Sequence, residues 1–122
     1  VRETSTVQDA VVMLFLENVG SLIVLDAKGK LSGIVSRKDL LKVTLGNSSA
    51  VSMPISFVMT RKPNIVTVSP DDEVITAAEK MINHQIDSLP VVQKGKDGEE
   101  EVVGRITKTT ITRVFLEFFQ RT

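Results

Sequence analysis

The chain has 122 residues, of which 42% are hydrophobic and 25% charged, a balance typical of a globular domain rather than a disordered segment. Its 15 basic residues equal its 15 acidic ones, so it lacks the positive field from which nucleic-acid-binding proteins gain affinity for any sequence. The absence of cysteine excludes disulfides, thiolate catalysis and cysteine-ligated zinc, and favours a reducing compartment, the cytoplasm.

The longest apolar runs, such as Leu22–Leu25, are far shorter than a membrane span. We also expect no signal peptide. Because the chain begins with Val1 rather than Met, we expect it to be a piece of a longer protein.

An internal repeat is the strongest signal in the sequence, and a repeat of this length determines the fold class. Residues 7–11 align with residues 74–78, and the register continues without a gap until residues 21–25 align with residues 88–92, an offset of 67 positions. The chain therefore contains two copies of one structural unit.

The second half of each copy aligns at a larger offset. Gly33-Ile34-Val35-Ser36 matches Gly104-Arg105-Ile106-Thr107, 71 positions later. The extra residues of the second copy fall in the polar segment 94–101, where a hairpin tip tolerates lengthening at low cost.

Each copy opens with a predicted amphipathic helix, because apolar residues recur at i, i+3, i+4, i+7 and i+8. The stripes are Val7, Ala10, Val11, Leu14, Phe15 and Val74, Ala77, Ala78, Met81, Ile82. Thr4, Ser5 or Thr6 is the candidate cap of the first helix. Ser69 is predicted to cap the second, with Pro70 as its first residue and three acidic residues, Asp71, Asp72 and Glu73, near its positive end.

Two short strands and a closing helix follow in each copy. The predicted strands are Leu22–Leu25 with Leu31–Val35, and Leu89–Val92 with Val102–Ile106, and Ile65–Val68 is an additional strand ahead of the second copy. The predicted closing helices are Arg37–Leu45 and Lys108–Phe119.

A unit of this size cannot bury its own apolar face, so two copies stacked sheet to sheet about a pseudo-twofold axis are expected to share a core. This predicts an α+β fold with repeats at residues 1–45 and 64–122. The connecting residues 46–63 contain two prolines and the apolar piece Ile55–Met59, which is typical of a structured linker.

Four pieces of the sequence together carry a resemblance to a known family. They are Phe57-Val58-Met59-Thr60 leading to Pro63, Val66-Thr67-Val68 before a helix, Ile86-Asp87-Ser88-Leu89-Pro90-Val91-Val92, and Gly33-Ile34-Val35-Ser36-Arg37-Lys38-Asp39-Leu40. In this ordered combination, over nearly the whole chain, the sequence resembles the tandem CBS-domain (Bateman) family.

The resemblance implies a regulatory module of two CBS repeats that binds AMP, ADP, ATP or S-adenosylmethionine in the cleft between them and controls an attached enzyme, channel or DNA-binding domain. Within the family the chain is most similar to the C-terminal regulatory modules of Bacillus-type repressors of gluconeogenic genes. It would then reach DNA only through an N-terminal helix-turn-helix domain that is absent here.

The candidate ligand site lies where a strand runs into a helix, because such a junction presents backbone N–H groups and the positive end of the helix dipole. Asp39 lies one turn after Ser36, and a carboxylate accepts hydrogen bonds from both hydroxyls of a ribose. Arg37 and Lys38 offer positive charge to phosphates. The alternative is that Ser36 and Asp39 only cap the helix and that both cations are solvated.

The family resemblance supplies the rest of the site. It implies that adenine lies against Ile34, Val66 and Ile86, that the backbone near Asn64, Val66 and Asp87 reads the base edge, and that Gly20 and Ser21 line the phosphate side. Arg37, Lys38, Arg61 and Lys62 favour ADP or ATP as the ligand, and AMP and S-adenosylmethionine stay open. The equivalent second site is weaker, because Thr110 replaces the acid beside Thr107 and Arg105 replaces the apolar base-pocket residue.

The sequence offers no catalytic or metal-binding set. His84 is the single histidine and is read as a residue of a helix C-terminus, and no triad or phosphate loop is present. The closing helix instead carries an apolar stripe, Ile111, Val114, Phe115, Phe118 and Phe119. This stripe either packs on the core of the chain itself or is buried against a second copy of the chain in a homodimer. We favour the homodimer.

Three functions remain in order of preference. The first is an adenine-nucleotide sensor in a transcriptional repressor, or in an enzyme or transporter. The second is a structural dimerisation module without a ligand. The third, an enzyme, lacks a catalytic constellation.

Overall fold

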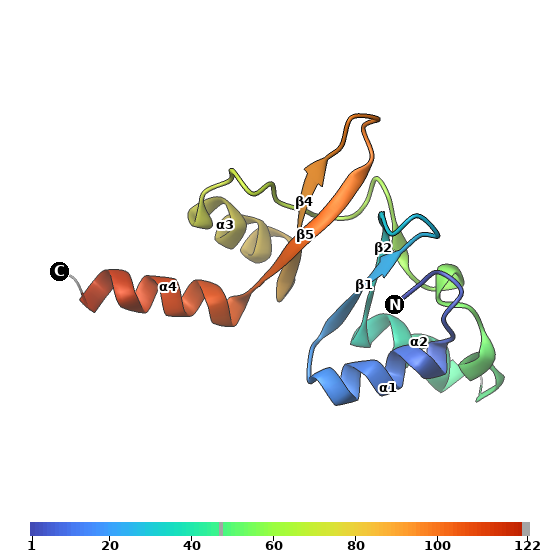
Figure 1. The fold of residues 1–122 in the computed structure, drawn as a ribbon. Coiled ribbons are helices and arrows are strands. Elements are labelled where there is room, and N and C mark those ends of the chain that lie inside the picture. Colours follow the sequence, from blue (N-terminus) through green and yellow to red (C-terminus); the bar gives the residue numbers. More distant parts are fainter. Residues whose placement is uncertain (47, 121–122) are drawn as a thin grey trace. The chain divides into compact units, whose positions relative to one another are not determined.

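The computed structural model describes residues 1–46 and 48–120, and these form two compact units, residues 1–65 and the residues from Val66 onward (Figure 1). The helices are α1 (Val7–Glu17), α2 (Arg37–Gly46), α3 (Val74–His84) and α4 (Lys108–Gln120), with short 3-10 helices η1 (Ser48–Ser52) and η2 (Ile55–Phe57). The strands are β1 (Ser21–Leu25), β2 (Leu31–Ser36), β3 (Thr60–Arg61), β4 (Ser88–Lys94) and β5 (Glu100–Thr107). The predicted α+β class and the helix–strand–strand–helix order of both copies are confirmed.

The hairpins of the two units share one register. Ser21 pairs with Ser36 in the antiparallel β1–β2 hairpin, as Ser88 pairs with Thr107 in β4–β5, and both hairpins have an irregularity at the equivalent step of their first strand. The repeat found in the sequence is therefore a repeat of backbone hydrogen bonds. The repeat boundaries at residues 45 and 64 stay a prediction, because compactness is a different criterion from sequence homology.

A short parallel contact precedes each helix. The Leu25 N–H donates to the Val1 carbonyl at 2.9 Å, and at the same offset the Val92 N–H donates to the Val68 carbonyl at 2.8 Å. The expected strand Ile65–Val68 is thus reduced to a single bridge at Val68. The first copy has the equivalent hydrogen bond at Val1.

Of the two predicted helix caps, the one for α1 is correct and the one for α3 is wrong. Thr6 caps α1, because its hydroxyl accepts from the Asp9 N–H at 3.1 Å while the Asp9 carboxylate accepts from the Thr6 N–H at 3.0 Å. Ser69 does not cap α3, which begins at Val74. The Ser69 N–H instead donates to the Asp72 carboxylate at 2.8 Å, and this local bond holds residues 69–72 in a turn ahead of the helix.

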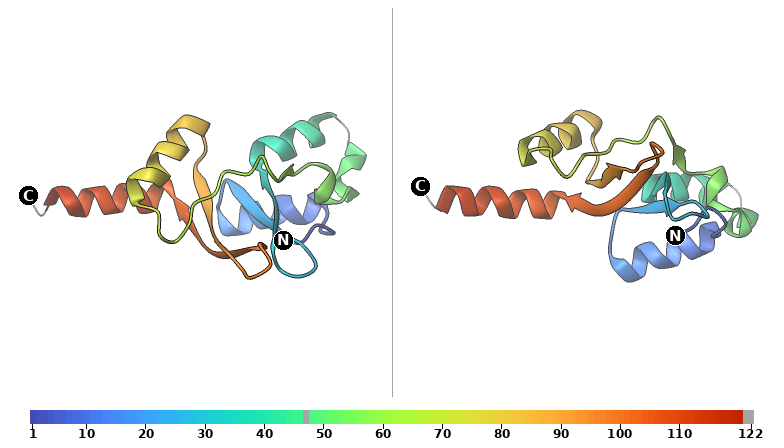
Figure 2. Two further views of the ribbon diagram at one scale, coloured as in Figure 1. Left: turned by 90° about the horizontal axis from the view of Figure 1, so that it is seen from above. Right: turned by 45° about the horizontal axis from the view of Figure 1, so that its top comes forward.

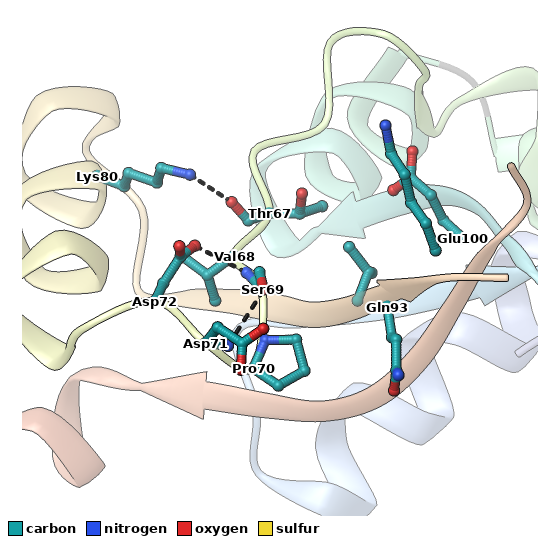
Figure 3. Close-up of a pocket in the computed structure, with 11 residues that line it drawn as sticks. Thr67, Val68, Ser69, Pro70, Asp71, Asp72, Lys80, Gln93 and Glu100 are labelled. Atoms are coloured by element: carbon teal, nitrogen blue, oxygen red, sulfur yellow. Dashed lines mark hydrogen bonds between the residues drawn. The ribbon is translucent and has the colours of Figure 1, made fainter.

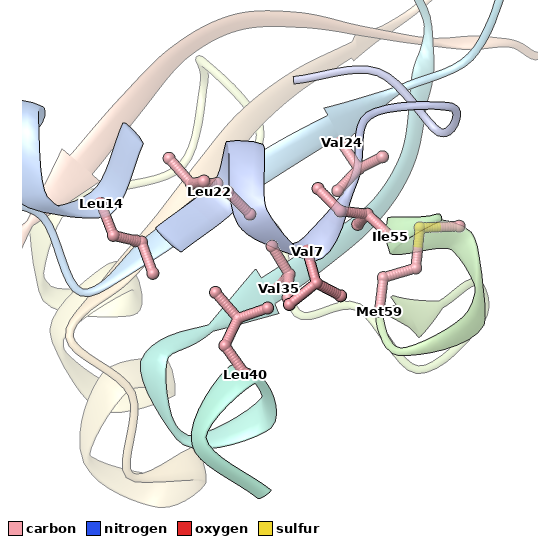
Figure 4. Close-up of a cluster of buried hydrophobic side chains, with 9 residues drawn as sticks. Val7, Leu14, Leu22, Val24, Val35, Leu40, Ile55 and Met59 are labelled. Atoms are coloured by element: carbon pink, nitrogen blue, oxygen red, sulfur yellow. The ribbon is translucent and has the colours of Figure 1, made fainter. Parts of the chain in front are cut away.

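The stretch after α2 completes the core of the first unit. The Val7 N–H donates to the Met53 carbonyl and the Ile55 N–H to the Ser5 carbonyl, each at 2.8 Å. Ile55 is 0% and Met59 8% exposed, and both pack among the buried side chains of α1, β1, β2 and α2 (Figure 4). β3 then pairs with the outer edge of β2.

The second unit has its own core and a two-stranded sheet. The buried residues that form this core come from the approach to α3, from α3, from β4 and from α4: Val68, Ala77, Ala78, Met81, Leu89 and Ile111. Figure 2 shows α4 running away from the β4–β5 hairpin, with its C-terminal turns reaching beyond α3.

Gly33 and Gly104 occupy equivalent strand positions and meet different surroundings. A Cβ atom on Gly33 would collide with the Met59 side chain and lie 2.8 Å from the Thr60 carbonyl oxygen. A Cβ atom on Gly104 would meet nothing closer than Val91 Cβ at 3.9 Å. Glycine is therefore required in the first unit because Met59 crosses directly over it.

We expect Gly33→Ala to lower the free energy of unfolding by about 1–3 kcal/mol, the usual cost of overpacking a close-packed core. Gly104→Ala is the matched control and should change it by less than about 0.5 kcal/mol. Urea denaturation followed by circular dichroism measures both. Equal effects at the two glycines would contradict the packing of Met59 over β2.

Candidate functional site

The predicted site residues of the first unit gather where β2 ends and α2 begins. Ser36 is the last residue of β2 and is paired with Ser21 at the start of β1. The Arg37 N–H donates to the Gly20 carbonyl at 3.1 Å. The junction therefore brings Gly20, Ser21, Ser36 and Arg37 together, and their role in ligand binding stays a prediction.

Ser36 and Asp39 form a reciprocal helix cap. Asp39 Oδ2 accepts from the Ser36 N–H at 3.0 Å and from the Ser36 hydroxyl at 2.9 Å, and the Ser36 hydroxyl accepts from the Asp39 N–H at 3.2 Å. The capping alternative is thus confirmed as geometry. Both residues are half-buried, so the cap is in partial contact with water.

The cap leaves part of the carboxylate available. Oδ2 takes both bonds from Ser36, and within residues 1–46 and 48–120 no hydrogen bond to Asp39 Oδ1 is present. A carboxylate oxygen accepts up to two hydrogen bonds, and a serine hydroxyl has two acceptor lone pairs. Asp39 Oδ1 and the second lone pair of Ser36 Oγ can therefore bind hydroxyl groups while the cap stays intact.

The other first-unit candidates are apolar, cationic and polar residues on β2, on α2 and after β3. Ile34 is half-buried in the middle of β2, where it pairs with Ile23 and Thr60. Arg37 and Lys38 are exposed in the first turn of α2. Asn64 is exposed, and its N–H donates to the Arg61 carbonyl at 2.9 Å.

The remaining candidates belong to the second unit. Val66 and Ile86 are half-buried against its core. Asp87 is exposed, its carbonyl accepts from the Lys108 N–H at 3.0 Å, and its carboxylate forms an ion pair with Lys108 at 2.9 Å. The sequence reading missed this ion pair, although the repeat alignment signals it, because Asp87 and Lys108 correspond to Gly20 and Arg37. That these residues share one ligand with Ser36 and Asp39 stays a prediction.

The equivalent junction of the second unit has the same geometry without the charge. The Thr107 hydroxyl accepts from the Thr110 N–H at 3.2 Å and lies 3.2 Å from the Thr110 hydroxyl. Arg105 Nη2 donates to Ser88 Oγ at 3.0 Å, and burial lowers the pKa of this guanidinium from its ordinary value. An uncharged cap next to a cation suits a ribose less well than the cap of Ser36 and Asp39.

A cavity lies near the tip of the second hairpin, at the end of β4 and the start of β5 (Figure 3). It measures about 540 Å³ and lies between the turn before α3 and the end of β4. Lys80 reaches from α3 to the Thr67 carbonyl at 2.7 Å, and Asp71, Asp72 and Glu100 also line the cavity. Asp87 and Thr107 lie at the other end of these strands, whereas the predicted residue Val66 directly precedes Thr67 in the cavity lining.

The described residues add three findings that bear on function. His84 is exposed and ends α3, as predicted. No group of three metal-ligating residues occurs in the searched part of the chain. No helix of that part is long and apolar enough to span a membrane.

The apolar stripe of α4 divides along the helix. Ile111 is buried and Phe115 half-buried against the second core, whereas Phe118 and Phe119 are 62% and 67% exposed and stack edge to face at 6.0 Å. The sequence reading missed a second apolar surface, a groove of about 320 Å³ between α1 and α2. Phe15 lines that groove and is 83% exposed.

These repeated hairpins and capped junctions are those of a CBS domain pair. The CBS domain family model matches residues 1–46 and 55–117, and the chain belongs to this family of regulatory modules.

Among curated proteins the chain is 42% identical to the transcriptional repressor CcpN of Bacillus subtilis over 95% of its own length and 54% of the length of CcpN. It is 30% identical to a homoserine O-acetyltransferase of Methanohalobium evestigatum, over 97% of its own length and 22% of that enzyme. The chain thus spans about half of the repressor and a much smaller part of the enzyme.

Three solved structures are similar in fold. A putative acetoin utilization protein from Vibrio cholerae has a TM-score of 0.82 and 29% identity, over 98% of this chain and 84% of that one. The CBS domain pair of protein MJ0100, in complex with 5′-methylthioadenosine and S-adenosyl-L-methionine, has a TM-score of 0.77 and 31% identity, over 96% of this chain and 86% of that one. CBSX2 in complex with AMP has a TM-score of 0.79 and 27% identity, over 97% of this chain and 87% of that one.

Proposed function

We propose that the chain is a non-catalytic, cytoplasmic module that senses an adenine nucleotide. The observation that carries the proposal is the capped β2–α2 junction, where Asp39 Oδ1 stays available beside the Ser36 hydroxyl. This arrangement suits the hydroxyls of a ribose. The adenosine compounds bound to MJ0100 and CBSX2 support the same ligand class for this chain.

The charges beside the junction favour a phosphorylated ligand. Arg37 and Lys38 are exposed at the N-terminus of α2, where the helix dipole also favours an anion. Two cations in this position match the negative charge of ADP or ATP better than that of AMP, and S-adenosylmethionine carries no phosphate at all. The ligand is therefore assigned as ADP or ATP.

The similarity to CcpN supports a role as the effector-binding part of a transcriptional repressor. With no net charge, the module would reach DNA through another domain. The match to an acetyltransferase over a fifth of that enzyme supports the alternative that the module regulates an enzyme. A ligand controls either effector only if it binds one arrangement of the module better than another.

Ligand binding should raise the thermal stability of the chain. At about 100 times Kd, a ligand that binds only the folded state adds about 2.7 kcal/mol, which raises Tm by several degrees. A thermal-shift series with AMP, ADP, ATP and S-adenosylmethionine should show the largest rise for ADP or ATP. No rise with any of the four would favour the ligand-free dimerisation module instead.

The two junctions supply matched variants for the ribose contact. Asp39→Thr reproduces the uncharged cap seen at Thr107 and Thr110, so it should keep α2 capped while removing the carboxylate. Loss of a charged hydrogen-bond partner should weaken nucleotide binding by about 1.5–3 kcal/mol, or roughly 10- to 150-fold. Thr110→Ala is the control and should leave affinity unchanged. Calorimetry showing equal affinity in Asp39→Thr and the unaltered chain would refute the role of Asp39.

We further propose that the chain forms a homodimer through the exposed part of the α4 stripe, Val114, Phe118 and Phe119, because Ile111 and Phe115 pack on the second core. The exposure of Phe118 and Phe119 supports this surface. Light scattering at micromolar concentration should give twice the monomer mass, and Phe118→Ser with Phe119→Ser should give the monomer mass. Phe15→Ser with Leu16→Ser, a double change at exposed apolar residues of α1, is the control and should leave the mass at twice that of the monomer. A monomeric unaltered chain would contradict the proposal.

A further inference from the structure

The two repeats differ at the edge of the first strand of each hairpin. In the first repeat, Arg2 forms a parallel bridge with Leu25 of β1, and its Nη1 donates to the Asp26 carbonyl at 2.8 Å. The Glu3 N–H donates to the Leu25 carbonyl at 3.2 Å. Arg2 and Glu3 therefore cover the end of β1.

The second repeat has Ser69 and Pro70 at the equivalent positions, 67 residues later. Ser69 has no guanidinium to extend over Gln93 at the end of β4, and Pro70 has no N–H that could donate to the strand. These three residues instead line the cavity of about 540 Å³ near the tip of the second hairpin. The cavity thus lies at the place that Arg2 covers in the first repeat.

Carboxylates line two sides of this cavity. Asp71 and Asp72 lie in the turn before α3, and Glu100 lies apart from them at the start of β5 (Figure 3). The lining also contains two cations, Lys80 and Lys94, and the Lys80 ammonium is already bonded to a backbone carbonyl at 2.7 Å. The acidic groups outnumber the basic ones, so the cavity favours a cation over an anion.

Two of these carboxylates have acceptor capacity left. Asp72 Oδ2 accepts from the Ser69 N–H at 2.8 Å, and within residues 1–46 and 48–120 no hydrogen bond to Asp72 Oδ1 or to the Asp71 carboxylate is present. An ionised carboxylate has about four acceptor sites. A planar guanidinium donates two parallel hydrogen bonds to one carboxylate, a geometry that an ammonium group does not match.

We propose that this cavity, between the turn of residues 69–72 and the end of β4, binds an alkylguanidinium ligand. The guanidinium lies against Asp71 and Asp72 and supplies to the second repeat the cation that Arg2 supplies to the first. The volume of about 540 Å³ lies in the range of small-molecule pockets. No residue that lines the cavity belongs to the predicted nucleotide site, so the inference is independent of the proposed function.

NMR titration of the whole chain with butylguanidinium tests the proposal. At constant ionic strength and up to about 50 mM of the probe, even weak binding is detected. We expect saturable amide shifts centred on Asp71, Asp72 and Gln93. Pentylammonium, which has the same charge and a similar length, is the control ligand. It should bind about tenfold more weakly or less, because it lacks the planar pair of donors.

Variants of the cavity separate binding from folding. Ser69→Arg restores the arginine of the first repeat, so it should fill the cavity and abolish the shifts. Asp71→Asn with Asp72→Asn removes both charges, while the amide oxygen at position 72 can still accept from the Ser69 N–H and keep the turn. This pair should weaken binding about tenfold or more. Asp97→Asn with Glu117→Gln removes the same charge outside the cavity and should leave binding unchanged.

Two further ligands identify the source of the guanidinium. Tighter binding of Nα-acetylarginine amide than of free L-arginine indicates an arginine side chain of a protein partner, and the reverse order indicates a free small molecule. Absence of saturable shifts with butylguanidinium, equal binding of pentylammonium, or unchanged binding in Asp71→Asn with Asp72→Asn would each overturn the proposal.

Discussion

The structure depends on how a helix starts at the end of a two-stranded hairpin. At both strand-to-helix junctions the last residue of the strand supplies a hydroxyl that caps the next helix, and the N–H of the following residue bonds back to the carbonyl before the first strand. These bonds satisfy donors that would otherwise be orphaned at the helix start. They also hold a polar group at a fixed place on each repeat.

At both junctions a strand hydroxyl accepts from an N–H of the next helix, but the chemistry of the two caps differs, and for this reason we propose different roles for them. The cap at Ser36 includes a carboxylate, whereas the cap at Thr107 has only hydroxyls and lies next to a partly buried guanidinium. Capping and ligand binding do not exclude each other at Asp39, because a carboxylate has more acceptor sites than the cap uses. A residue already held in place by a cap also loses little conformational freedom when a ligand binds.

The sequence predicted the features that follow from local chemistry. Helical periodicity placed α1 and α3, the repeat register placed all four hairpin strands, and a helix cap at Ser36 and Asp39 was given as the alternative to the ribose role. The wrong prediction at Ser69 also has a local cause, since both a cap and a turn use the same side-chain hydrogen bonds, and Asp72 favours the turn. Long-range features were not predictable: the burial of Met59 over Gly33 depends on a segment distant in sequence.

The chain is similar to 54% of a repressor and to 22% of an enzyme, and its own effector is a proposal. The account of its function depends on a carboxylate at only one of two equivalent helix starts. NMR titration of the chain with ADP tests this most directly, because both junctions are observed in one experiment. The account predicts amide shifts at Ser36 and Asp39 and little change at Thr107 and Thr110. Shifts confined to Thr107 and Thr110, or none at either junction, would contradict it.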